Sequence, residues 1–319
     1  MKKSFSSKQI FSGQAIWTNK TVVRILRKYW QYYLLLLAPM LFYIIFLYLP
    51  IAGNIIAFRR YQMGGSIFGD EWSGLRYFRM FLSDMEFWRV FVNTWRLSIS
   101  TLVFTFPIPI IFALLLNELR NIQFKRIVQT ISYLPHFLSM VIIVGILQEV
   151  TSPGSGVINQ LIEAFGGESI NFMIKPEWFA PLYIGSAIWQ DTGWNAIIYL
   201  AALTAIDPQL YEAARIDGAN RWKQTIHITL AGIIPTITVL FILAIGKLLM
   251  LGYEKVLLMY NQFTMPVADI LSTFVYRKGI NGGMHSYATA VGLFESIIAF
   301  ILVFSTNRFS RKLTGDSLW

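Results

Sequence analysis

The sequence predicts an all-α, polytopic membrane protein, and three observations carry this prediction. Of its 319 residues, 55% are hydrophobic and only 14% are charged, whereas a soluble domain carries roughly 25% charged residues. Several uninterrupted apolar stretches reach the roughly 20 residues that cross a bilayer as a helix, and the mean hydropathy is +0.53. The chain has no cysteine, which excludes a disulfide-stapled secreted domain, thiolate metal sites and thiol catalysis.

Six apolar stretches are long enough to be membrane-spanning helices. We place these helices at about 31–58, 93–116, 127–149, 179–203, 228–251 and 287–305. Proline removes a backbone donor and clashes with the preceding helical turn, so we expect kinks in four of the six helices, at Pro39, Pro50, Pro107, Pro109, Pro135 and Pro235.

The distribution of basic residues predicts the topology. A net charge of +10 raises the question of nucleic-acid binding, but Lys and Arg also gather in the cytoplasmic loops of membrane proteins. The first 29 residues hold seven basic residues and no acidic one. The remaining basic groups that decide the topology fall on that same side of the predicted helices: Arg120, Lys125, Arg126, Arg215, Arg221, Lys223, Arg308, Arg311 and Lys312. Both termini are therefore predicted to be cytoplasmic.

The predicted organisation has three parts: a basic cytoplasmic tail over 1–29, a transmembrane domain over 30–312 and a C-terminal tail over 313–319. The apolar run that begins at Tyr32 is too long for the core of a signal peptide, so the first helix is predicted to remain uncleaved. Within the N-terminal tail, Thr18 or Asn19 could cap a short basic amphipathic helix on the inner leaflet. A disordered basic tail is the alternative.

Several enzymatic motifs are absent from the sequence. Gly246-Lys247 is followed by Leu248, so the phosphate-binding loop of ATPases is missing. The three histidines are widely separated and no H-E-x-x-H motif occurs, which argues against a metalloenzyme. The G-x-S-x-G motif of serine hydrolases is also missing. We therefore expect no catalytic residue, no metal site and no cofactor in this chain.

The predicted inner loop at about 206–227 carries the most information. Asp207 is a good N-cap and Pro208 a good first helical residue, so a helix should begin there. Gly218 can supply the left-handed turn that ends this helix, and Asn220 can cap a second one. Glu212 offers a charge to a partner, and the two alanines after it would let another surface come close. By these arguments the loop is a docking element or a plain connector.

This inner loop resembles the EAA loop of permease subunits of binding-protein-dependent ABC importers, whose pattern is E-A-A, three residues, G, nine residues, I-x-L-P. The matching positions are Glu212, Ala213, Ala214, Gly218, Ile228 and Leu230. Ala231 stands where the family usually has proline, and Pro235 follows four residues later. Two further segments resemble the carbohydrate-uptake branch, particularly its polysaccharide and oligosaccharide permeases: 132–137 and 188–195. The resemblance covers roughly residues 30–312 and implies the type I importer fold.

The resemblance also implies a mechanism and its partners. Two permease subunits, of which the second is a different chain, would form the pathway for a sugar across the cell membrane. Two separate cytoplasmic subunits would hydrolyse ATP with Mg²⁺, and an extracytoplasmic binding protein would deliver an oligosaccharide or polysaccharide fragment. The EAA loop would dock into the ATPase and couple it to the pathway through Glu212, Ala213, Ala214, Asp217 and Gly218.

Polar residues at membrane depth are candidates for the pathway. Charged groups there cost roughly 2.5–3.5 kcal/mol at a helix centre, so they are expected to face an interior or aqueous cavity. Sugars also pack their apolar faces on aromatic rings, which brings in the neighbouring tryptophans. The candidates are Trp189, Gln190, Asp191, Trp194, Asn195 and Glu295. Alternatively, the tryptophans mark the membrane interface and the polar groups lie near a helix end. We expect His136 to be packed or hydrogen-bonded rather than a proton relay.

Two alternatives to an importer permease come from other classes of protein. A multispanning membrane enzyme that acts on lipid-linked sugars would use Asp191 or Glu295 in catalysis. A self-sufficient ion-coupled transporter would ordinarily show more helices or an inverted repeat, and neither is evident in the sequence.

Overall fold

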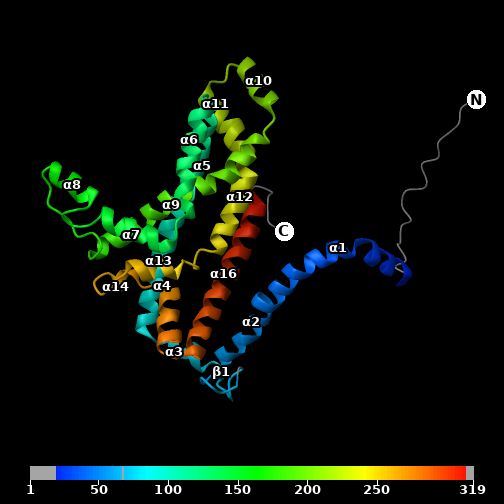
Figure 1. The fold of residues 1–319 in the computed structure, drawn as a ribbon, viewed down its shortest axis with the longest axis vertical. Coiled ribbons are helices and arrows are strands. Elements are labelled where there is room, and N and C mark those ends of the chain that lie inside the picture. The colour runs from blue at the N-terminus through cyan, green and yellow to red at the C-terminus, as the bar shows by residue number, and fades with distance from the viewer. Residues whose placement is uncertain (1–18, 67, 314–319) are drawn as a thin grey trace, which may run out of the picture. The chain divides into compact units, whose positions relative to one another are not determined.

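The computed structural model describes residues 19–66 and 68–313, and most of these residues are helical (Figure 1). The predicted all-α class is confirmed. The only strands among the described residues are two short ones that pair antiparallel, β1 (Arg59–Arg60) and β2 (Glu71–Trp72). The chain divides into two compact units, Met1–Ile55 and Ile56–Trp319.

The first unit is one long helical segment. It comprises α1 (Asn19–Tyr43), the π-helix η1 (Ile44–Tyr48), α2 (Leu49–Ile51) and the start of the 3-10 helix η2 (Ala52–Phe58). The backbone leaves helical geometry at Tyr29, which separates a basic first stretch from the apolar one. All of the side chains from 27 to 52 are exposed, as expected for a helix that meets lipid or another subunit. Residues 1–18 of the predicted tail lie outside the described residues.

The second unit contains the other five predicted spans. They correspond to α4 (Met85–Thr105) with α5 (Pro107–Glu118); α6 (Ile122–Tyr133) with η3 (Leu134–Phe137) and α7 (Met140–Val150); α9 (Pro176–Thr204); α11 (Arg221–Gln224) with η4 (Thr225–Leu230) and α12 (Ala231–Gly246); and α16 (His285–Leu313). The third span was predicted as one helix, but it is bent by 106° between α6–η3 and α7. Pro135 lies within η3, where its missing amide donor disfavours a continued α-helix. The break itself falls at Leu138, which has an extended backbone, and Ser139, which is the N-cap of α7.

Within the described part of the chain, four helices are long and apolar enough to cross a membrane: Arg27–Phe58, Met85–Glu118, Arg221–Gly246 and His285–Lys312. The bent pair would make a fifth. The 29-residue helix α9, which was predicted as the fourth span, is not among them. A multi-pass membrane protein is therefore confirmed, while the count of six spans and the cytoplasmic termini stay predictions.

Helix α9 is the centre of the second unit and contacts α4, α5, α6 and α12. Its approach to α6 requires a glycine: a Cβ on the buried Gly193 would lie 2.2 Å from the carbonyl oxygen of Ser132. On another side, Ala113 of α5 and Ala196 of α9 belong to one buried apolar cluster with Ile233 of α12. Small residues therefore let α9 pack closely against its neighbours, as is common between membrane helices.

The segments between the predicted spans contain short helices. These are α3 (Arg76–Leu82), α8 (Val157–Ala164), α13 (Tyr253–Met259), α14 (Met265–Ala268), α15 (Leu271–Val275) and the π-helix η5 (Tyr276–Asn281). Contacts distant in the sequence hold the region of α14 and α15. The amide of Asn93 in α4 donates to the carbonyl oxygens of Pro266 (2.8 Å) and Asp269 (3.2 Å), and the hydroxyl of Thr94 accepts from the amide of Leu271 at 2.8 Å.

An ion cluster joins the segment before α16 to the start of α4. We name it the Glu86 cluster, and it consists of Glu86, Asp269, Arg277 and Lys278. Arg277 binds Glu86 at 2.9 Å and also binds the fully buried Asp269, and Lys278 binds Glu86 at 2.8 Å. Burial acts to lower the pKa of Arg277, but the hydrogen bond to Glu86 and the charge of Asp269 outweigh it and raise the pKa.

Candidate functional site

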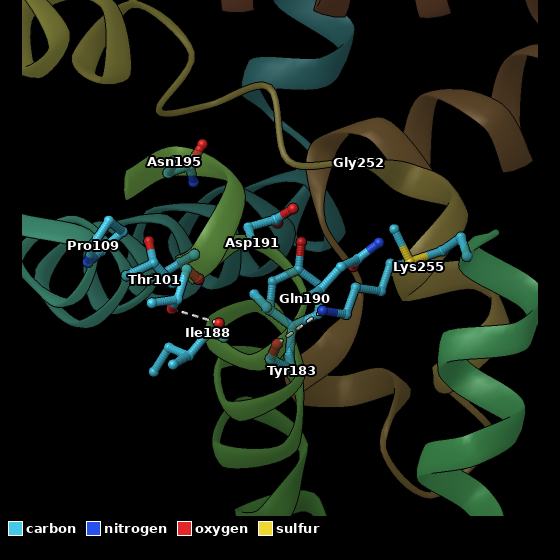
Figure 2. Close-up of a pocket in the computed structure, with 13 residues that line it drawn as sticks. Thr101, Pro109, Tyr183, Ile188, Gln190, Asp191, Asn195, Gly252 and Lys255 are labelled. Atoms are coloured by element: carbon cyan, nitrogen blue, oxygen red, sulfur yellow. Dashed lines mark hydrogen bonds between the residues drawn. The ribbon is translucent and has the colours of Figure 1, made fainter. Parts of the chain in front are cut away.

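A cavity of about 240 Å³ lies beside the middle of α9 (Figure 2). Side chains from α4, α5, α7, α9 and α13 line it together with Gly252. Its polar lining residues are Thr101, Thr105, Gln190, Asp191, Thr192, Asn195 and Lys255, and Tyr183 adds a ring. The second unit therefore places a polar cavity among helices that are otherwise apolar.

Helical periodicity explains why α9 supplies most of this lining. Tyr183, Ala187, Asp191 and Asn195 recur every fourth residue and all line the cavity. Residues at that spacing lie on one face of a helix. The face that α9 turns to the cavity is thus more polar than the face that it packs on α5.

His136 connects the bend after α6 to this face of α9. Its Nδ1 lies 2.9 Å from Oδ1 of Asp191, and its ring stacks on that of Trp194 with centroids 4.5 Å apart. His136 lies in η3, directly before the break at Leu138 and Ser139. The prediction of a hydrogen-bonded histidine is confirmed.

The structure brings together some of the six predicted pathway residues but not all. Gln190, Asp191 and Asn195 line the cavity. Trp194 does not line it, but it stacks on His136, which bonds to Asp191. Trp189 is 47% exposed and Glu295 is a partly buried residue of α16, and neither is among the residues that line this cavity.

Sequence reasoning missed Lys255. This lysine of α13 is only 4% exposed. Its ammonium donates to the carbonyl oxygen of Tyr183 at 3.0 Å and lies 4.6 Å from the centroid of the Tyr183 ring. The only signal in the sequence was the pair Glu254-Lys255 shortly after the predicted fifth span, and nothing local shows which of the two turns inward.

The predicted helix pair of the inner loop is present. In α10 (Pro208–Ile216), Oδ1 of Asp207 accepts from the amide of Gln209 at 2.9 Å, and in α11 Oδ1 of Asn220 accepts from the amide of Lys223 at 2.9 Å. Gly218 has a φ of +75°, so it supplies the left-handed turn that was expected. Asp217 is the C-cap residue of α10.

The same segment presents part of α10 to solvent. Glu212 and Ala213 are exposed, and Ala214 is half-buried. The hydroxyls of Tyr211 and Thr229 lie 3.0 Å apart and join α10 to η4. An open groove of about 660 Å³ separates α10 and α11 from the end of α5 and includes Arg120 and Arg215. The helix pair is thus joined to η4 through Tyr211 and to the end of α5 through the pair of Arg221 with Glu118 at 3.9 Å, while Glu212 and Ala213 remain exposed.

No group of three or more His, Cys, Asp or Glu side chains that could hold a metal ion occurs within residues 19–66 and 68–313.

The family model described as "Binding-protein-dependent transport system inner membrane component" matches residues 105–315. The chain is similar to the polygalacturonan/rhamnogalacturonan transport system permease protein YteP of Bacillus subtilis, with 46% identity over 90% of this chain and 89% of that protein.

Its fold is similar to a chain in the crystal structure of a bacterial ABC transporter involved in the import of the acidic polysaccharide alginate. The TM-score is 0.84 and the identity 38%, over 92% of this chain and 99% of that one. The same values describe the structure of that transporter in complex with an alginate pentasaccharide-bound periplasmic protein.

These relatives are transport proteins, and they give no support to the reading as a membrane enzyme on lipid-linked sugars. The family resemblance predicted from the inner loop is confirmed. The likeness extends over the whole transmembrane region rather than over that loop alone. This chain belongs to the family of binding-protein-dependent transport system inner membrane components, as a membrane-spanning permease subunit of an ABC importer.

Proposed function

We propose that this permease forms part of the translocation pathway for an oligosaccharide or a polysaccharide fragment. The observation that carries the proposal is 46% identity, over 90% of the chain, with a permease named for polygalacturonan and rhamnogalacturonan transport. The alginate transporter, 38% identical over 92% of the chain, is named for another polysaccharide. Two systems with related cargo support a carbohydrate for this chain as well.

The cavity beside α9 would be one point on the pathway. Gln190, Asp191 and Asn195 offer the mixture of donors and acceptors that binds sugar hydroxyls. Trp194 stacks on His136 at the rim of the same group. Trp189 and Glu295 remain proposed pathway residues, and because they lie off this cavity they would meet the substrate at another stage.

The coupling residues are proposed to be Glu212, Ala213, Ala214, Asp217 and Gly218. Exposed Glu212 and Ala213 would enter a cleft of a cytoplasmic ATPase, and Gly218 would fix the turn that orients α10. Closure of the ATPase would then move the helix pair, and the contact of Tyr211 with Thr229 would pass the movement to η4 and α12.

The complete importer would contain three further kinds of subunit. A second permease of different sequence would complete the pathway, and two ATPases would bind ATP with Mg²⁺. A substrate-binding protein outside the cell would deliver the sugar, as the complex of the alginate transporter with its periplasmic protein supports. The tails 1–29 and 313–319, which precede and follow the transmembrane domain 30–312 in the sequence, would both lie in the cytoplasm.

Reconstitution tests this function. The chain is purified with its ATPase and partner permease, placed in proteoliposomes and supplied with the binding protein and a labelled oligogalacturonate. We expect uptake that requires ATP and the binding protein. An assembled complex that hydrolyses ATP but takes up no oligosaccharide from a panel of neutral and acidic sugars would contradict the proposal.

A further inference from the structure

The cavity beside α9 contains a buried cation. Lys255 is 4% exposed, and its ammonium uses one of its three donors on the carbonyl oxygen of Tyr183. Within the described part of the chain, this ammonium has no ion pair with a carboxylate. A buried charge is costly unless it is paired. Among these residues, only the charge of Asp191 acts on the ammonium, and it does so without an ion-pair contact.

The acidic residue that lines the cavity already has a hydrogen-bond partner. Asp191 lines the same cavity, but its Oδ1 is held by Nδ1 of His136 at 2.9 Å. The cation of the cavity is thus available to a negative group that comes from outside the chain.

Two neutral polar groups accompany this cation. Gln190 is only 7% exposed, and its side-chain amide makes no hydrogen bond to the described residues. The hydroxyl oxygen of Thr101 is buried and likewise has no partner among them. Both residues line the cavity (Figure 2). Buried polar groups are normally hydrogen-bonded. The missing partners of Gln190 and Thr101 therefore point to a polar ligand.

We propose that this cavity is a subsite for the carboxylate-bearing unit of an anionic sugar, and that Lys255 selects for its charge. This inference rests on the proposed function and narrows its substrate class. An ammonium binds a carboxylate by a charge-assisted hydrogen bond. Gln190 and Thr101 can form hydrogen bonds with the hydroxyl groups of the same sugar ring.

The size and charge of the cavity fit one sugar unit in transit. Its volume of about 240 Å³ is below the roughly 300–1,000 Å³ of pockets that enclose a drug-sized ligand. One unit of a chain would occupy it while the rest lies along the pathway. A single cation attracts an acidic unit yet binds it weakly enough for release, which a conducting pathway requires.

The test uses the complete transporter in proteoliposomes with labelled trigalacturonate and with the same trisaccharide after its carboxyl groups are reduced to alcohols. Uptake by the variant is divided by uptake by the wild type for each sugar, which cancels any preference of the binding protein. For Lys255→Met we expect a loss of at least about tenfold for trigalacturonate and a change of less than about twofold for the reduced sugar.

Two further variants serve as controls. Lys255→Arg retains the charge and should retain most of the uptake of trigalacturonate. Lys175→Met removes an exposed lysine from the N-cap of α9 and should leave the uptake of both sugars unchanged. Equal loss of both sugars in Lys255→Met, or no loss of either, would overturn the charge-selecting role.

A measurement on the wild type covers the case in which the Lys255 variants fail to assemble. Binding of both trisaccharides to the purified complex, without the binding protein, is followed by tryptophan fluorescence. We expect trigalacturonate to bind at least about tenfold more tightly than the reduced sugar; equal affinity would overturn the inference alone. A wild-type complex that neither binds nor takes up any oligosaccharide would overturn the proposed function and this inference with it.

Discussion

The cavity beside α9 and the coupling segment, residues 207–224, are held by different kinds of contact. In the cavity, Lys255 bonds to a residue 72 positions away and His136 to one 55 positions away. In the coupling segment, each cap bonds to an amide only two or three positions away, at Asp207 and Asn220. The cavity therefore depends on the packing of the whole second unit, whereas the coupling segment depends mainly on its own sequence.

This difference predicts how substitutions divide between stability and function. A change in a region held by distant contacts leaves buried groups unpaired or forces helices apart, so it should lower the stability of the protein. A change on the exposed face of α10 removes little internal contact, so it should act on the partner alone.

The largest effect is expected from Arg277→Met in the Glu86 cluster. It would leave Asp269, which has no exposed surface, as an uncompensated buried charge, at a cost of about 3–5 kcal/mol. Thermal unfolding of the purified complex measures the loss. The control is Arg89→Met, because Arg89 pairs with Glu86 at 3.8 Å on an exposed side chain and should contribute less than about 1 kcal/mol. Equal losses for the two variants would contradict the role of burial.

Gly193→Ala should be the next most damaging. The new Cβ would meet the backbone of Ser132 at 2.2 Å, so α6 and α9 must separate at a cost of about 1–3 kcal/mol. Gly185→Ala on the same helix is the control, because a Cβ there meets nothing within 4 Å. It should stabilise the helix by about 0.5–1 kcal/mol. The prediction fails if both variants unfold at the wild-type temperature.

Gly218→Ala should cost about 1–2 kcal/mol, because an L-residue is strained in the left-handed conformation that Gly218 adopts with φ of +75°. The loss stays local, while ATP-driven uptake should fall much further because α10 changes its orientation. Gly145→Ala, within α7 and with nothing within 4 Å of the new Cβ, should keep full uptake. Normal uptake by Gly218→Ala would show that the turn does not orient the docking helix.

The smallest effect on stability is expected from Glu212→Gln. Glu212 is exposed, so the free energy of unfolding should change by no more than about 0.5 kcal/mol. Stimulation of ATP hydrolysis by the loaded binding protein should nevertheless be strongly reduced. Glu163→Gln, at an exposed position near the end of α8, is the matched control and should leave stimulation unchanged. A large fall in the unfolding temperature of Glu212→Gln would show that the coupling segment is not independent of the core.

The same contrast explains what could be predicted from the sequence. The helix pair at 207–224 was predicted down to its caps because Asp207, Pro208, Gly218 and Asn220 act on neighbouring backbone. The long apolar helices were predicted because their length and composition are local properties. Gln190, Asp191 and Asn195 were recognised as polar groups on a membrane helix, and periodicity places Asp191 and Asn195 on one face of α9.

The features that could not be predicted depend on contacts between residues far apart in the sequence, which no local sequence pattern indicates. Lys255 and the Glu86 cluster join residues far apart in the chain, and short helices such as α13 and α15 are fixed by such contacts rather than by a periodic apolar face. A kink was expected at Pro135, whereas the structure bends by 106° three to four residues later, at Leu138 and Ser139. Glu295 was selected for its charge at membrane depth, but it lies on α16, which contributes nothing to the lining of the cavity.

The central claim, that the coupling segment docks on an ATPase, is tested most directly by cross-linking. The chain has no cysteine, so Ala213→Cys places a single thiol on the exposed face of α10, and Ser155→Cys places one in the loop before α8 as a control. A short thiol-to-amine cross-linker is applied to the active complex. The account predicts that the ATPase is joined to Ala213→Cys and not to Ser155→Cys; an active complex in which Ala213→Cys never reaches the ATPase would contradict it.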